Sequence, residues 1–267
     1  MLFLHGIYNR GRNIPVLIHF SMIKQIPNII TSLNLLCGCV ALFFAVSGDL
    51  ISASFFVFFG VFFDFFDGLA ARLLNAHSAV GLEFDSLADM ITSGVVPAIV
   101  MVQLLNESFF GGTLHITETF SANGWNIGMT NYLPFIGLLI AVASGYRLAK
   151  FNVDTRQTTR FIGLPTPANA LLILSLPLML YFQPSYWIEG IILNKWFLIG
   201  LTIMSSILLN SELPLFGLKF KTWGFKGNAI RYVFLAVCVL LLVLLKFIAI
   251  PLIILIYILL SLRWRDI

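Results

Sequence analysis

Long apolar runs alternate with short polar connections along most of the chain. Helices of about 20 apolar residues can cross a bilayer. The pattern predicts eight such spans, at residues 29–48, 50–74, 82–105, 131–152, 165–183, 194–211, 229–246 and 247–262. Only the segment from Phe247 to Pro251 separates the last two, so Pro251 could instead be a kink within one bent pair. We therefore expect an all-α polytopic membrane protein.

Composition and charge support this interpretation and orient the chain. Hydrophobic residues make up 59% and charged residues 10%, against roughly half and a quarter in soluble domains. With eight spans, fourteen of the 16 Lys and Arg residues lie on the side of the two termini, and only Lys195 and Lys246 lie opposite. Because basic loops stay in the cytoplasm, we expect both termini there. The net charge of +4 suits anionic lipid headgroups and needs no nucleic-acid partner.

The N-terminal residues do not fit this membrane topology. Residues 1–20 lack both a clean apolar signal-peptide core and a small-residue cleavage site, whereas Met22 opens a short basic segment before the first span. We expect Met22 to be the physiological start, and residues 1–21 to be a non-native or disordered extension.

Four aspartates at the facing ends of the second and third spans are the strongest chemical signal. Asp64 and Asp67 are three residues apart, and Asp85 and Asp89 are four apart, so on helices each pair shares a face. Carboxylates within a membrane are costly and usually functional. An all-oxygen, anionic cluster suits Mg²⁺ or Mn²⁺.

The residues beside the first pair are small or basic. Gly68 and Ala71 leave the helix face next to the carboxylates nearly bare, and Arg72 follows. A bare face lets another group approach the backbone, and a guanidinium suits phosphate. Together these features predict a pyrophosphate site, although Gly68 and Ala71 alone would also suit helix packing.

The block Asp64-x2-Asp67-Gly68-x2-Ala71-Arg72-x8-Gly81-x3-Asp85-x3-Asp89 resembles the signature of the CDP-alcohol phosphatidyltransferases. The resemblance implies a six-helix core, a homodimer and two divalent ions, Mg²⁺ or Mn²⁺. It also implies a role for each residue of the motif. One ion would be held by Asp64, Asp67 and Asp85, and the other by Asp64, Asp85 and Asp89. Asp89 would be the general base, and the CDP-lipid would be contacted by Gly68, Ala71, Arg72 and Ser78.

Two flanking stretches are similar to bacterial and archaeal phosphatidylserine synthases. The stretch from Ile26 to Gly38 implicates Asn28 and Thr31 in CDP-lipid binding, although Asn28 also suits a helix start. The stretch from Arg147 to Ala168 offers Arg147 and Lys150 for the serine carboxylate, with Lys150 standing where arginine is more usual. The resemblance therefore implies that the enzyme transfers a phosphatidyl group from CDP-diacylglycerol to L-serine, giving phosphatidylserine and CMP.

This interpretation divides the chain into a catalytic core at 22–211 and a cytoplasmic loop with a C-terminal hairpin at 212–267. It places the protein in the cell (inner) membrane with the aspartates facing the cytoplasm. Two alternatives stay open. The acceptor could be glycerol-3-phosphate or an inositol phosphate, and, less favoured, the aspartates could line a divalent-cation transport path.

Overall fold

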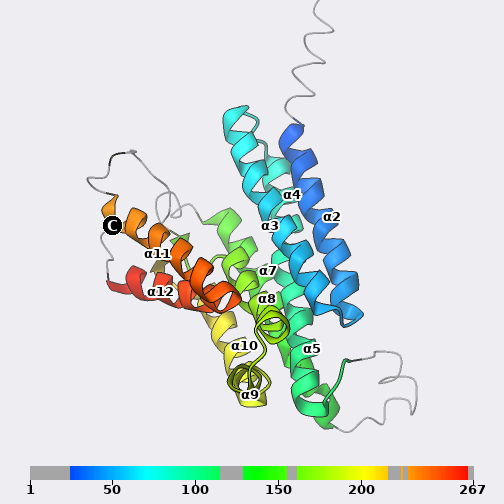
Figure 1. Cartoon of the computed structure of the whole chain (residues 1–267). Coiled ribbons are helices and arrows are strands. Elements are labelled where there is room, and N and C mark those ends of the chain that lie inside the picture. Colours follow the sequence, from blue (N-terminus) through cyan, green and yellow to red (C-terminus); the bar gives the residue numbers. More distant parts are fainter. Residues whose placement is uncertain (1–24, 115–128, 155–160, 216–223, 225–227, 264–267) are drawn as a thin grey trace, which may run out of the picture.

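The chain folds into a bundle of helices (Figure 1). The computed structural model describes residues 25–114, 129–154, 161–215, 224 and 228–263, so the predicted extension at 1–21 lies outside the described residues. The elements are α2 (Ile26–Val46), α3 (Leu50–Leu73), α4 (Ala79–Asp89), η1 (Met90–Val95), α5 (Val96–Phe110), η2 (Met129–Leu138), α7 (Leu139–Val153), β1 (Phe161–Ile162), α8 (Thr166–Phe182), α9 (Tyr186–Ile192), α10 (Lys195–Asn210), β2 (Pro214–Leu215), α11 (Ala229–Leu245), η3 (Lys246–Ile248) and α12 (Ala249–Arg263).

The helices confirm an all-α polytopic membrane protein. Among the described residues, five apolar helices are long enough to span a bilayer, or six if the bent pair α9 and α10 is one span. One of them is the continuous helical stretch Ala79–Phe110, formed by α4, η1 and α5. The lipid-facing surface is correspondingly apolar, and Phe43, Val142 and Val243 are each about 70% exposed or more.

This count is smaller than the eight predicted spans, because helix lengths differ from the lengths of the apolar runs. The predicted span 165–183 is the 17-residue helix α8, which at 1.5 Å per residue is about 25 Å long and shorter than a bilayer core of about 30 Å. The last two predicted spans fall within one apolar stretch, Arg231–Arg263. There α11 and α12 meet at a bend (Figure 1), where Lys246 has φ +51°, so the break precedes Pro251.

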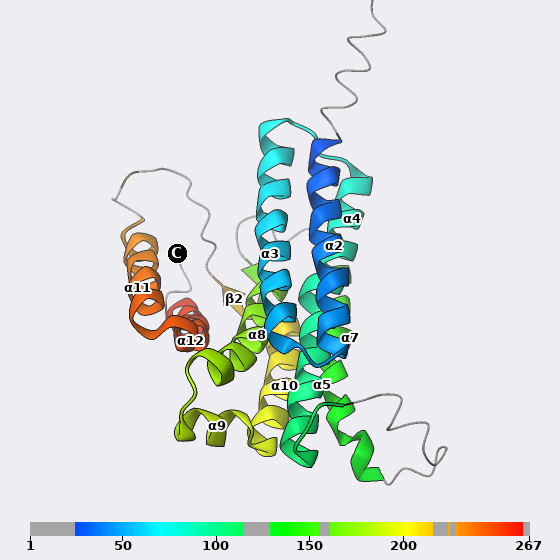
Figure 2. The same ribbon diagram turned by 45° about the vertical axis from the view of Figure 1, so that its right-hand side comes forward.

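Gln183, at the end of α8, satisfies the backbone at this bend. Its side-chain oxygen accepts hydrogen bonds from the N–H groups of Phe247 (2.9 Å) and Ile248 (3.4 Å), and its Nε2 donates to the carbonyl of Leu245 (3.1 Å). A break in an apolar helix needs such partners, since lipid offers none. The C-terminal pair is thereby joined to the bundle, beside α8 in both ribbon views (Figures 1 and 2).

Helix α2 packs closely on α3 through a face of small and polar residues. The buried positions recur every three or four residues, namely Pro27, Thr31, Asn34, Gly38, Ala41 and Ala45. A Cβ added at Gly38 would lie 2.4 Å from the Thr92 hydroxyl, and one at Gly60 would lie 2.5 Å from Cγ2 of Thr92. The two glycines therefore let η1 approach both α2 and α3, as small residues do between membrane helices.

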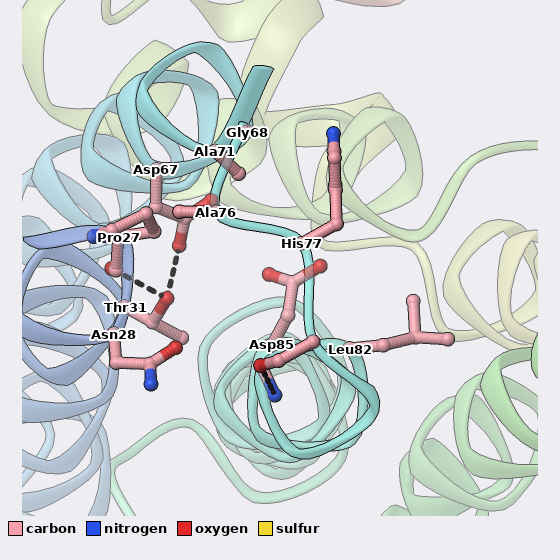
Figure 3. A pocket seen from close by; sticks show the side chains of 12 residues that line it. Pro27, Asn28, Thr31, Asp67, Gly68, Ala71, Ala76, His77, Leu82 and Asp85 are labelled. Atoms are coloured by element: carbon pink, nitrogen blue, oxygen red, sulfur yellow. Dashed lines mark hydrogen bonds between the residues drawn. The ribbon is translucent and has the colours of Figure 1, made fainter. Parts of the chain in front are cut away.

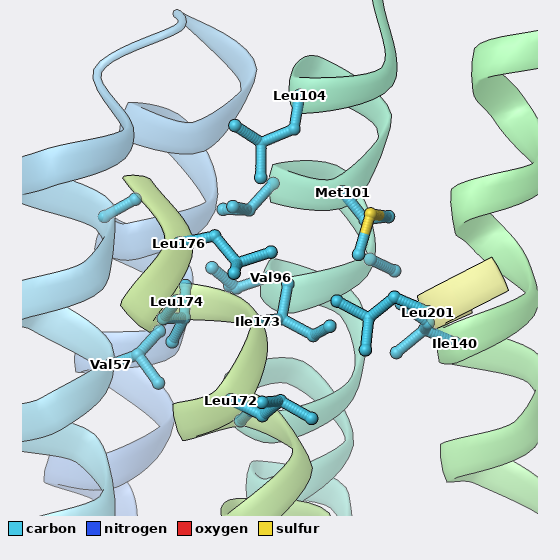
Figure 4. Packing of buried hydrophobic residues seen from close by; sticks show 14 of the residues in the cluster. Val57, Val96, Met101, Leu104, Ile140, Leu172, Ile173, Leu174, Leu176 and Leu201 are labelled. Atoms are coloured by element: carbon cyan, nitrogen blue, oxygen red, sulfur yellow. The ribbon is translucent and has the colours of Figure 1, made fainter. Parts of the chain in front are cut away.

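The apolar core lies below the aspartate-bearing helix ends and joins α3, α5, α7, α8 and α10. Ile173 from α8 points toward Met101 of α5 and Ile140 of α7, and Leu174 lies beside Val57 of α3 (Figure 4). All five side chains are fully buried. This core fixes the relative positions of the helices that carry the aspartates at one end of the bundle.

A short strand pair shapes the loop that precedes α8. Strands β1 and β2 pair antiparallel, and the N–H of Leu164 bonds to the carbonyl of Leu208 at 3.0 Å. Gly163 has φ +75°, and a Cβ there would lie 2.7 Å from the Leu209 carbonyl oxygen, so this position requires glycine. The loop is thus held against the end of α10 and brings Pro165 and Thr166 toward the aspartates.

Candidate active site

Asp64 and Asp67 on α3 face Asp85 on α4, and Asp89, the last residue of α4, lines a cavity together with Asp64 and Asp85. A short turn joins these helices, and Ser78 caps α4 by accepting a hydrogen bond from the Gly81 N–H at 3.0 Å. Carboxylate oxygens of Asp64, Asp67 and Asp85 lie within 4.8 Å of one another. The structure therefore brings together the three residues predicted to share one ion.

These carboxylates fit a divalent cation. Asp67 is 5% exposed, and Oδ1 of Asp85 is buried without a hydrogen-bond partner among the described residues. Buried acceptor oxygens are costly when unpaired, so a cation among them would supply the missing partner. A hard, oxygen-only donor set is the kind that Mg²⁺ and Mn²⁺ prefer.

One cavity, of about 150 Å³, opens between the ends of α2, α3 and α4, and we name it the donor cavity (Figure 3). Its wall contains five of the six residues predicted to contact the CDP-lipid, namely Asn28, Thr31, Gly68, Ala71 and Ser78. Asp67 and Asp85 form its carboxylate side. Among the described residues, the atom nearest to a Cβ added at Gly68 is Arg72 Nη2, at 3.9 Å, so the strip beside Asp67 is open.

Arg72, the sixth predicted residue, lies outside this wall. Its side chain is exposed, and its Nε donates to the Gly68 carbonyl at 2.9 Å. His77, an exposed residue of the turn between α3 and α4, also lines the donor cavity (Figure 3). Its sequence neighbourhood carries no signal that would have indicated this position.

A second cavity, of about 290 Å³, lies on the other side of the cluster, and we name it the acceptor cavity. It is lined by Asp64, Leu82, Asp85, Ser86, Asp89, Arg147, Leu148, Phe151, Asn152, Pro165, Thr166 and Pro167. Asp85 is common to the two walls. The four carboxylates therefore stand between two cavities, and Asp64 and Asp89 face only the second.

Arg147 is the buried cation of the acceptor cavity. It is 7% exposed, its Nη1 donates to the Thr166 hydroxyl at 3.4 Å, and its guanidinium lies 5.9 Å from the Phe151 ring centroid. Its Nε has no hydrogen-bond partner among the described residues. A buried, incompletely paired guanidinium beside a cavity is suited to an anionic ligand.

Lys150, the other residue predicted to bind serine, is engaged elsewhere. Its Nζ forms an ion pair with Glu212 at 3.2 Å, and it is absent from the described lining of the acceptor cavity. Asn152, which the sequence did not single out, does line it and donates hydrogen bonds to Ser86 (3.0 Å) and Glu83 (3.2 Å). The acceptor cavity therefore has a polar wall besides Arg147.

A helical bundle with apolar spans thus carries an acidic cluster that fits a cation, with a cavity on either side of it. The sequence profile of the CDP-alcohol phosphatidyltransferase family matches residues 24–208. The chain belongs to this family, as the aspartate motif predicted.

Curated relatives narrow the comparison. The CDP-diacylglycerol–serine O-phosphatidyltransferase of Bacillus subtilis (strain 168) is 36% identical over 148 residues, which cover 54% of this chain and 70% of the relative. The protein with that name from Helicobacter pylori (strain J99) is 29% identical over 212 residues, 79% of each chain. The one from Mycobacterium tuberculosis (strain H37Rv) is 30% identical over 202 residues, 72% of this chain and 61% of the relative.

Proposed function

We propose that the protein is a CDP-diacylglycerol–serine O-phosphatidyltransferase that forms phosphatidylserine and CMP. The observation that carries this proposal is the position of Asp85, which lines both the donor and the acceptor cavity. A transferase must hold two substrates against one reacting centre. The names of the relatives supply the identity of the two substrates.

The donor cavity holds the CDP part of the lipid. Gly68 and Ala71 let the pyrophosphate approach the backbone of α3, and Asn28, Thr31 and Ser78 offer polar atoms around it. Two divalent ions, Mg²⁺ or Mn²⁺, would be held by Asp64, Asp67 and Asp85 and by Asp64, Asp85 and Asp89. When bound, they neutralise charge on the phosphate oxygens and on the departing CMP.

Asp89 is the general base. A serine hydroxyl is a poor nucleophile until a base takes its proton, and Asp89 lines the acceptor cavity. In the overall reaction the hydroxyl oxygen bonds to the phosphorus that carries diacylglycerol. The bond from that phosphorus to the oxygen of CMP breaks, CMP leaves with the electron pair, and the proton passes to Asp89.

Arg147 binds the carboxylate of L-serine. Its unpartnered Nε and its place beside Asp89 in one cavity support this role. Oxygen atoms of Ser86 and Asn152, in the same wall, are acceptors for the serine ammonium. Lys150 is paired with Glu212 and therefore affects serine binding at most indirectly.

The lipid part of the donor stays in the membrane. An apolar groove of about 530 Å³, lined by Phe58, Pro165, Ala168, Leu171, Phe234, Leu235, Cys238, Leu242, Ile250, Ile253, Ile254 and Tyr257, shares Pro165 with the acceptor cavity and suits acyl chains. The excess of basic residues expected on one side of the membrane supports a site at the cytoplasmic face of the inner membrane. Family resemblance indicates a homodimer.

The test is to supply the purified protein with CDP-diacylglycerol, Mn²⁺ and a panel of alcohols, and to identify the lipid product by mass spectrometry. We expect phosphatidylserine with L-serine. A product formed only from glycerol-3-phosphate or an inositol phosphate would show that this alcohol, and not L-serine, is the acceptor. No product with any alcohol, together with Mn²⁺ uptake into proteoliposomes, would favour transport instead.

A further inference from the structure

Asn34 is a fully buried amide in the middle of α2, and it points to one of the aspartates. It is 0% exposed, and its Nδ2 donates to Oδ1 of Asp89 at 3.3 Å. Among the described residues, Asn34 is absent from the linings of the donor and acceptor cavities, whereas Asp89 lines the second. The amide therefore holds Asp89 from behind the site without itself facing a substrate.

The surroundings of Asn34 leave its side chain little freedom. The Thr92 hydroxyl of η1 donates to the backbone carbonyl of Asn34 at 3.2 Å. From α3, a Cβ added at Gly60 would lie 2.9 Å from Oδ1 of Asn34. Helix α3 thus packs against the amide oxygen while η1 binds the backbone of the same residue, and close packing of this kind fixes one side-chain orientation.

The chemistry of the pair determines which end of the amide faces Asp89. An ionised carboxylate only accepts hydrogen bonds, so the NH₂ group must point toward it and the amide oxygen away. That oxygen is buried and has no hydrogen-bond partner among the described residues. Leaving a buried acceptor unpaired costs free energy, so this orientation is not explained by stability alone.

We propose that Asn34 is a positioning residue for the general base. By binding Oδ1 of Asp89, the amide stops rotation of the carboxylate and keeps Oδ2 directed at the acceptor cavity. Small displacements of a reacting group lower the rate strongly, and partners behind a functional carboxylate are worth roughly 10- to 100-fold in activity. This inference rests on the proposed function.

The test compares Asn34→Leu, which removes the amide at similar size, with Asn106→Leu. Asn106 is also buried, and its Nδ2 donates to the Gly112 carbonyl at 2.7 Å. It lies on α5, in the helical stretch Ala79–Phe110 that also contains Asp89, but at the far end of that stretch from Asp89. We expect Asn34→Leu to lower kcat roughly 10- to 100-fold. The KM values for serine and CDP-diacylglycerol should stay within about threefold, and calorimetric binding of CDP-diacylglycerol should be retained. Asn106→Leu should lower the melting temperature without lowering kcat.

Three results would overturn the inference: an Asn34→Leu enzyme with wild-type kcat, an equal loss of kcat in Asn106→Leu, or a loss of donor binding that accompanies the loss of rate. If Asn34→Leu does not fold, Asn34→Ala, which adds no bulk, is judged by the same separation of kcat from KM. A wild-type enzyme without serine-dependent CMP release would refute the proposed function itself. A wild-type enzyme with such release beside an equally active Asn34 variant would refute only the role of Asn34.

Discussion

The hydroxyl of Thr31 on α2 donates a hydrogen bond of 2.6 Å to Oδ2 of Asp67 on α3. Thr31 is 3% exposed and lines the donor cavity, so it orients a carboxylate as well as facing the space assigned to the nucleotide (Figure 3). Sequence resemblance predicted only the second of these roles.

Removing this hydroxyl should weaken metal binding. In Thr31→Val the side chain keeps its shape but loses the donor, so Asp67 is no longer oriented, and we expect the Mn²⁺ concentration for half-maximal activity to rise roughly 10- to 100-fold. Thr31→Ser keeps the hydroxyl and should resemble the wild type. Titration of bound Mn²⁺ by electron paramagnetic resonance measures the same change without turnover. Equal Mn²⁺ affinity in Thr31→Val and wild type would argue against this role.

Adding a methyl group at Gly68 should weaken donor binding while the fold is kept. The nearest atom to a Cβ there is Arg72 Nη2, at 3.9 Å, so Gly68→Ala fits sterically but narrows the donor cavity. We expect the KM for CDP-diacylglycerol to rise roughly tenfold, or about 1.4 kcal/mol. Gly200→Ala on α10, where nothing lies within 4 Å, is the matched control and should leave this KM unchanged. An unchanged KM in Gly68→Ala would show that the pyrophosphate does not lie on this strip.

Substitution of Arg147 and of Lys150 should change the KM for serine to different extents. Arg147→Ala removes the buried cation of the acceptor cavity, and we expect the serine KM to rise by more than roughly tenfold with a much smaller change for CDP-diacylglycerol. Lys150→Ala removes a partly exposed ion pair with Glu212, which is worth at most about 1 kcal/mol, so the serine KM should change little. Initial-rate kinetics with each substrate varied in turn measure both effects. A larger serine effect in Lys150→Ala than in Arg147→Ala would reverse the assignment.

Asp49 should make the start of α3 sensitive to acid. Its carboxylate accepts a hydrogen bond from the Ser52 N–H at 3.0 Å, and hydrogen bonding from Ser52 lowers the pKa of Asp49. A lowered pKa in the folded state means that the cap stabilises above the pKa of the unfolded chain and is lost as the pH falls through the folded value. Asp49→Ala should cost about 1 kcal/mol at neutral pH, whereas Asp49→Asn should keep the cap and lose its pH dependence. Thermal unfolding in detergent from pH 3 to 7 measures this, and an Asp49→Ala enzyme as stable as wild type at pH 7 would contradict it.

The all-α membrane fold and the family followed from the sequence, whereas the lengths of individual helices did not. The spacing of each aspartate pair predicted that its two members share a helix face, and the family resemblance implied that Asp64, Asp67 and Asp85 meet, as they do. The lengths of α8 and of the C-terminal pair could not be read from apolar runs, because lipid-facing and buried residues look alike in hydropathy. Their ends depend on tertiary partners such as Gln183.

The sequence also did not predict which residues far apart in the chain bind each other. The Lys150–Glu212 pair and the Asn34–Asp89 hydrogen bond join positions 62 and 55 residues apart, and no local pattern relates them. Asn34 was visible only as a polar residue three positions after Thr31 in an apolar helix. That spacing places the two on one face, but the identity of the facing helix came from the packing of α2 on α3 and η1.

Phosphatidyl transfer to L-serine with Asp89 as the general base is tested most directly by CMP release. The purified enzyme is supplied with CDP-diacylglycerol, Mn²⁺ and L-serine, and the wild type is compared with Asp89→Asn. We expect serine-dependent release by the wild type. In Asp89→Asn we expect a loss of at least roughly 100-fold in kcat, with CDP-diacylglycerol still bound. Serine-dependent release that continues at the wild-type rate in Asp89→Asn, or release by the wild type that does not respond to serine, would contradict this mechanism.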